Sequence, residues 1–157
     1  MSPVRLLSKC PVETFTYGVR LGSLLKRGDV VCLYGELGSG KTIIAKGIAS
    51  ALGIPERDIT SASFVIISEH RGVLHGNAVP FYHIDLYRIE KHEQLDALGI
   101  EDLMGHEGIA VVEWAERLGE PPDSISVRLK MLGGEERELT IGGVYEEDWD
   151  HQQARQA

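Results

Sequence analysis

A glycine-rich stretch that ends in lysine and threonine carries the clearest chemistry in the sequence. Residues 35–42 read Gly-Glu-Leu-Gly-Ser-Gly-Lys-Thr and match the phosphate-loop pattern G-x-x-x-x-G-K-[ST] at every fixed position. In such a loop the backbone N–H groups point at one phosphate chain, with the positive end of the next helix behind them. We expect Lys41 to reach the β- and γ-phosphates of a nucleotide and Thr42 to ligate Mg²⁺. The cradle itself would consist of Gly35, Gly38, Ser39 and Gly40.

The residues on either side of this loop have the order that the motif requires. Residues 30–34 are a short apolar run, which predicts a buried strand. Residues 43–52 have apolar side chains at helical spacing, and Gly53 follows as a helix stop. Strand, loop and helix therefore occur in sequence, and we interpret the stretch as a nucleotide-binding site rather than a glycine-rich turn.

Two acids stand directly after apolar strands and are candidates for the rest of the site. Asp85 follows residues 79–84, and Glu113 follows residues 109–112. Acids delivered in this way hold Mg²⁺ or orient the attacking water in phosphate-loop enzymes. Together with Lys41 we expect them to be catalytic, with Asp85 mainly on the ion and Glu113 mainly on the water. The alternative for either acid alone is an exposed strand end, and His83 fits a core-edge histidine better than a catalyst.

The elements that must position these residues predict an α/β fold. We expect a P-loop NTPase-like three-layer sandwich with a mixed central sheet and a C-terminal β-hairpin, formed as one domain by residues 1–143. Residues 144–157 are polar and acidic, so we expect a frayed or weakly helical tail. The remaining predicted elements are strands at 4–7, 64–68, 125–132 and 137–141, helices at 11–26 and 90–98, and a short turn at 100–104.

Composition limits the function further. The chain has 157 residues and a net charge of −8, so it lacks the clustered Lys and Arg that grip a nucleic-acid backbone. We therefore expect no DNA binding, and contact with RNA only through another subunit. Cys10 and Cys32 are far apart and fit reduced thiols. No apolar run is long enough for a signal or a membrane span, which predicts a cytoplasmic protein.

Four sequence elements in combination point to a family. They are residues 35–42, Ser61-Ala62-Ser63-Phe64, His83-Ile84-Asp85-Leu86-Tyr87-Arg88 and Glu113-Trp114-Ala115-Glu116-Arg117. This combination resembles the TsaE (YjeE) family of bacterial P-loop ATPases, which takes part in making threonylcarbamoyladenosine in tRNA. The resemblance implies a Mg²⁺-dependent ATPase, weak alone, that supports threonylcarbamoyl transfer to the adenosine next to the anticodon. It also implies a complex with the TsaB–TsaD pair.

The resemblance also assigns roles to individual residues. The Mg²⁺ site would involve Thr42, Asp85 and Glu113, and residues 61–64 would form a switch-like loop near the γ-phosphate. Thr14 and Arg137 would approach the nucleoside. The chain departs from the family where Ala62 and Ala115 replace prolines, which frees backbone conformations that a proline would fix.

Other functional classes that use a phosphate loop are less well supported. A small-molecule kinase normally adds an arginine-bearing lid, and the sequence has no arginine-rich insertion. A GTP-binding switch reads guanine through N-K-x-D, but the only asparagine, Asn77, precedes Ala78. A non-hydrolysing ATP-binding adaptor stays open, because a sequence shows where water can be oriented and not whether it reacts.

Overall fold

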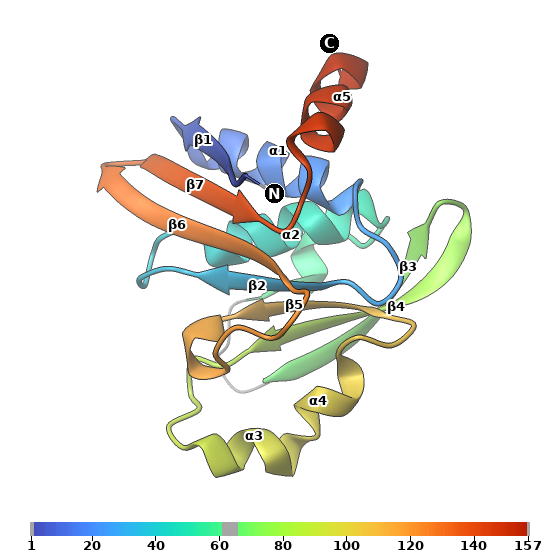
Figure 1. The fold of residues 1–157 in the computed structure, drawn as a ribbon. Coiled ribbons are helices and arrows are strands. Elements are labelled where there is room, and N and C mark those ends of the chain that lie inside the picture. Colours follow the sequence, from blue (N-terminus) through green and yellow to red (C-terminus); the bar gives the residue numbers. More distant parts are fainter. Residues whose placement is uncertain (1, 61–65, 157) are drawn as a thin grey trace.

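The structure is a computed structural model that describes residues 2–60 and 66–156 (Figure 1). The expected switch-like loop at 61–64 lies outside these residues. In chain order the elements are β1 (Val4–Ser8), α1 (Pro11–Gly22), β2 (Val30–Tyr34), α2 (Lys41–Ala51), η1 (Glu56–Asp58), β3 (Ile67–Leu74), β4 (Asn77–Asp85), α3 (His92–Leu98), α4 (Ile100–Leu103), β5 (Ile109–Glu113), η2 (Ala115–Arg117), β6 (Ile125–Gly133), β7 (Glu136–Gly142) and α5 (Glu146–Gln156).

One seven-stranded sheet runs through the molecule in the order β1-β7-β6-β2-β5-β4-β3. β2 pairs in parallel with β6 and β5, and β5 pairs in parallel with β4. The outer pairs β1–β7, β6–β7 and β3–β4 are antiparallel. The α/β class, the mixed sheet and the C-terminal hairpin are thus confirmed. Parallel β2, β4 and β5 end at the same edge, so the residues that follow them meet there.

Helices cover both faces of the sheet and make the expected three layers. α1 and α2 lie on one face, and α3 and α4 lie on the other (Figure 1). Because β2 is central, both of its sides are buried: Val31 and Leu33 join the core under α1 and α2, and Val30 and Cys32 join the core under α3 and α4. This burial explains why its sequence is an unbroken apolar run.

α1 and α2 pack with their backbones in contact. A Cβ atom on Gly18 would lie 2.6 Å from the carbonyl oxygen of Ile44, and one on Gly47 would overlap the carbonyl oxygen of Phe15. Only glycine permits this approach. α1 thereby holds the helix that begins at the phosphate loop.

Several element boundaries differ from the sequence-based expectations. α1 ends at Gly22 instead of residue 26, because the backbone tightens into turns in which Leu24 and Leu25 donate to Leu21 and Gly22. The strand expected at 64–68 is described from Ile67 to Leu74, a stretch whose polar residues an edge strand tolerates. The antiparallel hairpin that it forms with β4 is confirmed.

The C-terminal tail is helical, which the expectation of a frayed or weakly helical segment allowed, and it packs on the domain more closely than a frayed tail would. It forms α5, whose Trp149 is only 2% exposed and stacks 4.1 Å from the Arg20 guanidinium of α1. Val144 is buried as well. Two apolar side chains in a polar segment are a weak sequence pattern, but they suffice to pack the tail on α1. Among the described residues, no helix has both the length and the apolar character needed to cross a membrane; the cytoplasmic location stays a prediction.

Candidate functional site

The phosphate loop connects the end of β2 to the start of α2, and its shape depends on glycine. Gly38 and Gly40 have φ of 80° and 108°, which side chains rarely adopt. A Cβ atom on Gly35 would lie 2.5 Å from the Ser39 hydroxyl oxygen. The first N–H groups of α2 have no partner within the helix and point into the loop, as an anion site requires.

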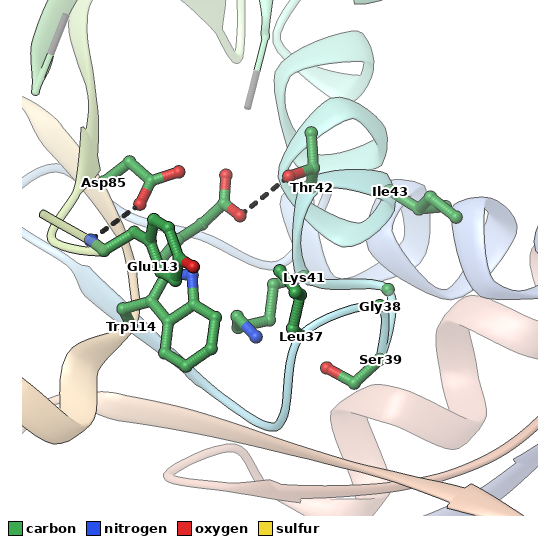
Figure 2. Close-up of a pocket in the computed structure, with 11 residues that line it drawn as sticks. Leu37, Gly38, Ser39, Lys41, Thr42, Ile43, Asp85, Glu113 and Trp114 are labelled. Carbon is green, nitrogen blue, oxygen red and sulfur yellow. Dashed lines mark hydrogen bonds between the residues drawn. The ribbon is translucent and has the colours of Figure 1, made fainter. Parts of the chain in front are cut away.

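A cavity of about 380 Å³ lies beside this loop (Figure 2). Most of the residues that the sequence pattern singled out line this cavity. They lie in the phosphate loop, at the start of α2 and at the ends of β4 and β5. The residues that line the cavity are Leu37, Gly38, Ser39, Gly40, Lys41, Thr42, Ile43, Asp85, Tyr87, Glu113 and Trp114.

Lys41 is buried and held at the start of the loop. Its Nζ donates to the carbonyl oxygens of Gly35 and Glu36 at 2.5 and 2.9 Å. The same nitrogen lies 3.8 Å from the centre of the Trp114 ring. Burial lowers the pKa of Lys41, and the negative charge of Glu116, followed by the other acids of the cavity, opposes this shift. The loop thus fixes the ammonium group where a phosphate chain would lie.

The two acids lie side by side opposite the loop. Asp85 and Glu113 are register partners on β4 and β5, and both are buried. The Thr42 hydroxyl donates to Oε1 of Glu113 at 2.8 Å, and Oδ1 of Asp85 accepts the N–H of Tyr87 at 3.0 Å (Figure 2). The sequence-predicted trio of Thr42, Asp85 and Glu113 therefore converges on one edge of the cavity.

This trio has the donor set that Mg²⁺ prefers. Its ligating groups are one hydroxyl and two carboxylates, all hard oxygen donors. The 2.8 Å between Thr42 and Glu113 oxygens is close to the roughly 3.0 Å that separates neighbouring ligands of an octahedral ion with bonds of about 2.1 Å. The trio contains only two acids, and in the described parts of the chain no group of three or more His, Cys, Asp and Glu side chains could hold a metal. An ion at this site would therefore depend on few protein ligands together with phosphate and water, as Mg²⁺ commonly does.

His83 is buried, as a core-edge histidine should be, and its partner is Glu113. The ring nitrogen Nε2 lies 2.5 Å from Oε2 of Glu113. Sequence reasoning found no such pair because the two residues are 30 positions apart. The contact follows from the parallel pairing of β4 and β5, which places the residues on the same face of the sheet.

Thr14 and Arg137 lie on the other side of the loop, where both line a second cavity of about 130 Å³. The Thr14 hydroxyl shares a 2.7 Å hydrogen bond with the Ser8 hydroxyl. Arg137 donates to the carbonyl oxygens of Gly38 and Ser39 at 3.0 and 3.1 Å. The structure thus places both residues beside the loop, with their polar groups engaged by the protein itself.

Two residues contribute more to the site than the sequence indicated. Trp114 has φ of 57°, its ring centre lies 5.1 Å from that of Tyr87, and it covers Lys41. The exposed carboxylate of Glu116 accepts the N–H of Gly35 at 2.9 Å. A left-handed tryptophan leaves no pattern in a sequence, and only its position directly after Glu113 pointed to the site.

Comparisons with known proteins agree with this geometry. A family model described as "Threonylcarbamoyl adenosine biosynthesis protein TsaE" matches residues 8–139. The chain is 34% identical to the tRNA threonylcarbamoyladenosine biosynthesis protein TsaE of Treponema pallidum, over 88% of this chain and 99% of that protein. It is 38% identical to the protein of the same name in Bacillus subtilis, over 87% and 85% of the two chains.

A solved structure extends the likeness to the fold. The crystal structure of Bacillus subtilis YdiB superposes with a TM-score of 0.75 at 31% identity, covering 99% of this chain and 97% of that chain. The family match spans the phosphate loop, both acids and Arg137. The chain therefore belongs to the TsaE family, which takes part in the biosynthesis of threonylcarbamoyladenosine in tRNA.

Proposed function

We propose that this protein binds ATP together with Mg²⁺ and hydrolyses the ATP. The observation that carries the proposal is the contact between the phosphate-loop hydroxyl of Thr42 and the carboxylate of Glu113, with Asp85 next to it. A loop that merely binds an anion does not need two buried acids at its edge, because their charge repels phosphate. A divalent cation between the acids and the phosphates removes this conflict.

Each side chain of the site has a distinct task in this proposal. Lys41 holds the β- and γ-phosphates, and Thr42 with Asp85 would hold the ion, with secondary support from Glu113. Bound Mg²⁺ would neutralise charge on the β- and γ-oxygens. Glu113 orients the attacking water and accepts its proton, because its side chain is longer than that of Asp85 and could reach past the ion to a water. Direct ligation by Glu113 also fits the 2.8 Å contact, so the two acids are assigned by experiment below.

The hydrolysis would serve threonylcarbamoyl transfer to the tRNA adenosine next to the anticodon. Family membership supports this role, and we propose that the protein acts with the TsaB–TsaD pair. With a net charge of −8 the chain is poorly suited to grip tRNA alone. The tRNA would therefore be bound by the partners, and this protein would contact it only indirectly.

Phosphate release tests the proposal. Purified protein is incubated with ATP and Mg²⁺, first alone and then with the TsaB–TsaD pair and tRNA. We expect slow release alone and faster release with the partners, with Lys41→Ala inactive in both. An ATP-binding adaptor would bind ATP without releasing phosphate in either mixture. A small-molecule kinase would transfer the γ-phosphate to a further acceptor, so ADP formation that depends on added metabolites and is not matched by phosphate release would contradict the proposal.

A further inference from the structure

The two carboxylate oxygens of Glu113 have different partners. Oε1 accepts the hydrogen bond of Thr42, at the cavity, and Oε2 lies against Nε2 of His83, away from it. Glu113 and His83 are 2% and 4% exposed. Glu113 thus faces the site, and His83 contacts Glu113 from the side away from the cavity.

The position of His83 follows from the sheet. His83 and Asp85 are two residues apart on β4 and share a face, and Glu113 is the register partner of Asp85 on β5. On this face the apolar core begins with Phe81 and Val111. The imidazole therefore lies beside Val111, between Phe81 and Asp85 along β4. Glu113 has the apolar Leu33 as its register partner on β2, so His83 offers its carboxylate a polar contact within apolar surroundings.

The contact with His83 should stabilise the buried carboxylate of Glu113 and fix its orientation. A buried carboxylate oxygen without a hydrogen-bond partner is destabilising. Glutamate also has three rotatable side-chain bonds, so a single hydrogen bond to Thr42 leaves its carboxylate free to turn. A second contact at Oε2 fixes both ends of the carboxylate at once, which is how ligands of metal sites are commonly oriented.

We propose that His83 is a positioning residue that holds Oε2 of Glu113 so that Oε1 faces Thr42 and the Mg²⁺ site. This inference rests on the proposed function. It assigns His83 neither as a metal ligand nor as a nucleophile partner, because its Nε2 is already engaged by Glu113. The effect of His83 should therefore be felt through the ion and not through the phosphate loop.

Nucleotide affinity with and without the ion separates these two routes. ATP binding is measured by calorimetry in excess Mg²⁺ and in EDTA for wild type, His83→Ala and His83→Gln. The affinity gained from Mg²⁺ should fall about 10-fold or more in His83→Ala, as for other residues that orient metal ligands. The affinity in EDTA should stay unchanged. His83→Gln should restore most of the gain, since its amide N–H can reach Oε2 from a position near that of Nε2.

A second histidine of the same sheet provides the control. His70 lies on β3, is half-buried and contacts the hydroxyl of Ser68 at 3.0 Å. His70→Ala should keep the wild-type response to Mg²⁺. Circular dichroism checks that each variant is folded. If His83→Ala does not fold, His83→Asn replaces it, because the shorter amide stays polar but does not reach Glu113.

The outcomes distinguish the two proposals. A wild-type response to Mg²⁺ in folded His83→Ala or His83→Asn would overturn the positioning role and leave the proposed function intact. An equal loss of affinity in EDTA and in Mg²⁺ would also overturn it, since a merely structural defect affects both. If wild type and His70→Ala themselves gained nothing from Mg²⁺, the proposed function would fail and the positioning role with it.

Discussion

The two sides of the phosphate loop are built differently, although both are lined with polar side chains. On the side of β4 and β5, Thr42, Asp85 and Glu113 face a cavity of about 380 Å³. On the side of α1 and β7, the polar groups of Arg137 and Thr14 form hydrogen bonds with other protein atoms, beside a cavity of about 130 Å³. We interpret the first side, the acid side, as the place of the proposed reaction, and Arg137 on the second, the holding side, as a support for the loop.

The largest effect should come from removing the positive charge of the phosphate-loop lysine, Lys41. Lys41→Ala should reduce ATP binding below what calorimetry detects, because the ammonium is the charge that the loop places on the β- and γ-phosphates. In the described part of the chain its Nζ donates to loop carbonyls and lies over the Trp114 ring, so the fold should survive. A folded Lys41→Ala protein with wild-type affinity would remove the basis for calling this loop a nucleotide site.

Next in size are the substitutions on the acid side, which should differ from each other. Glu113→Gln should bind ATP nearly normally, because its amide oxygen can still support the ion from the position that Oε1 occupies beside Thr42. It should hydrolyse ATP about 10²-fold more slowly, because a positioned proton acceptor is lost. Asp85→Ala should instead raise the Mg²⁺ requirement and weaken binding. Single-turnover hydrolysis and ATP affinity across a Mg²⁺ titration, with partners present, check both. The reverse pattern would exchange the two roles.

A smaller effect is expected on the holding side. Arg137→Ala should weaken ATP binding about 10-fold, since hydrogen bonds from a charged group to the loop contribute about 1.5–3 kcal/mol. The loss should be the same with Mg²⁺ and in EDTA, because the arginine shapes the loop and does not touch the ion site. Arg5→Ala, at an exposed position of the neighbouring strand β1, is the matched control. A loss seen only with Mg²⁺ would show that the two sides are not separate.

The smallest effect concerns the base. The chain has no N-K-x-D motif, so ATP should protect the protein from thermal unfolding more than GTP does at equal concentration. The expected difference is a few degrees, measured with Mg²⁺ present. Equal protection by both nucleotides would count against adenine selectivity.

The contrast between the two sides also explains what the sequence could predict. Lys41 and Thr42 were readable because a local pattern with strict spacing fixes their surroundings. Asp85 and Glu113 were readable because each ends an apolar strand, and parallel strands end at a common edge. The mixed sheet followed from the same apolar runs and the glycine turn of the last hairpin.

What the sequence did not reveal depends on contacts between distant segments. Arg137 reaches Gly38 across 99 positions, and His83 reaches Glu113 across 30. The packing of Trp149 on α1 and the left-handed backbone of Trp114 are likewise set by tertiary surroundings. Arginine and histidine are compatible with many partners, so residue type alone does not select among them.

The glycine contact between α1 and α2 has a thermodynamic consequence for ligand affinity. Gly18 and Gly47 bring the two backbones together without an intervening layer of side chains, so no rotamers are available there to absorb movement. We therefore expect the two helices to move as one rigid unit, and the phosphate loop leads directly into α2. A cradle attached to a stiff support loses little conformational entropy when a ligand arrives, so more of the interaction energy remains as affinity.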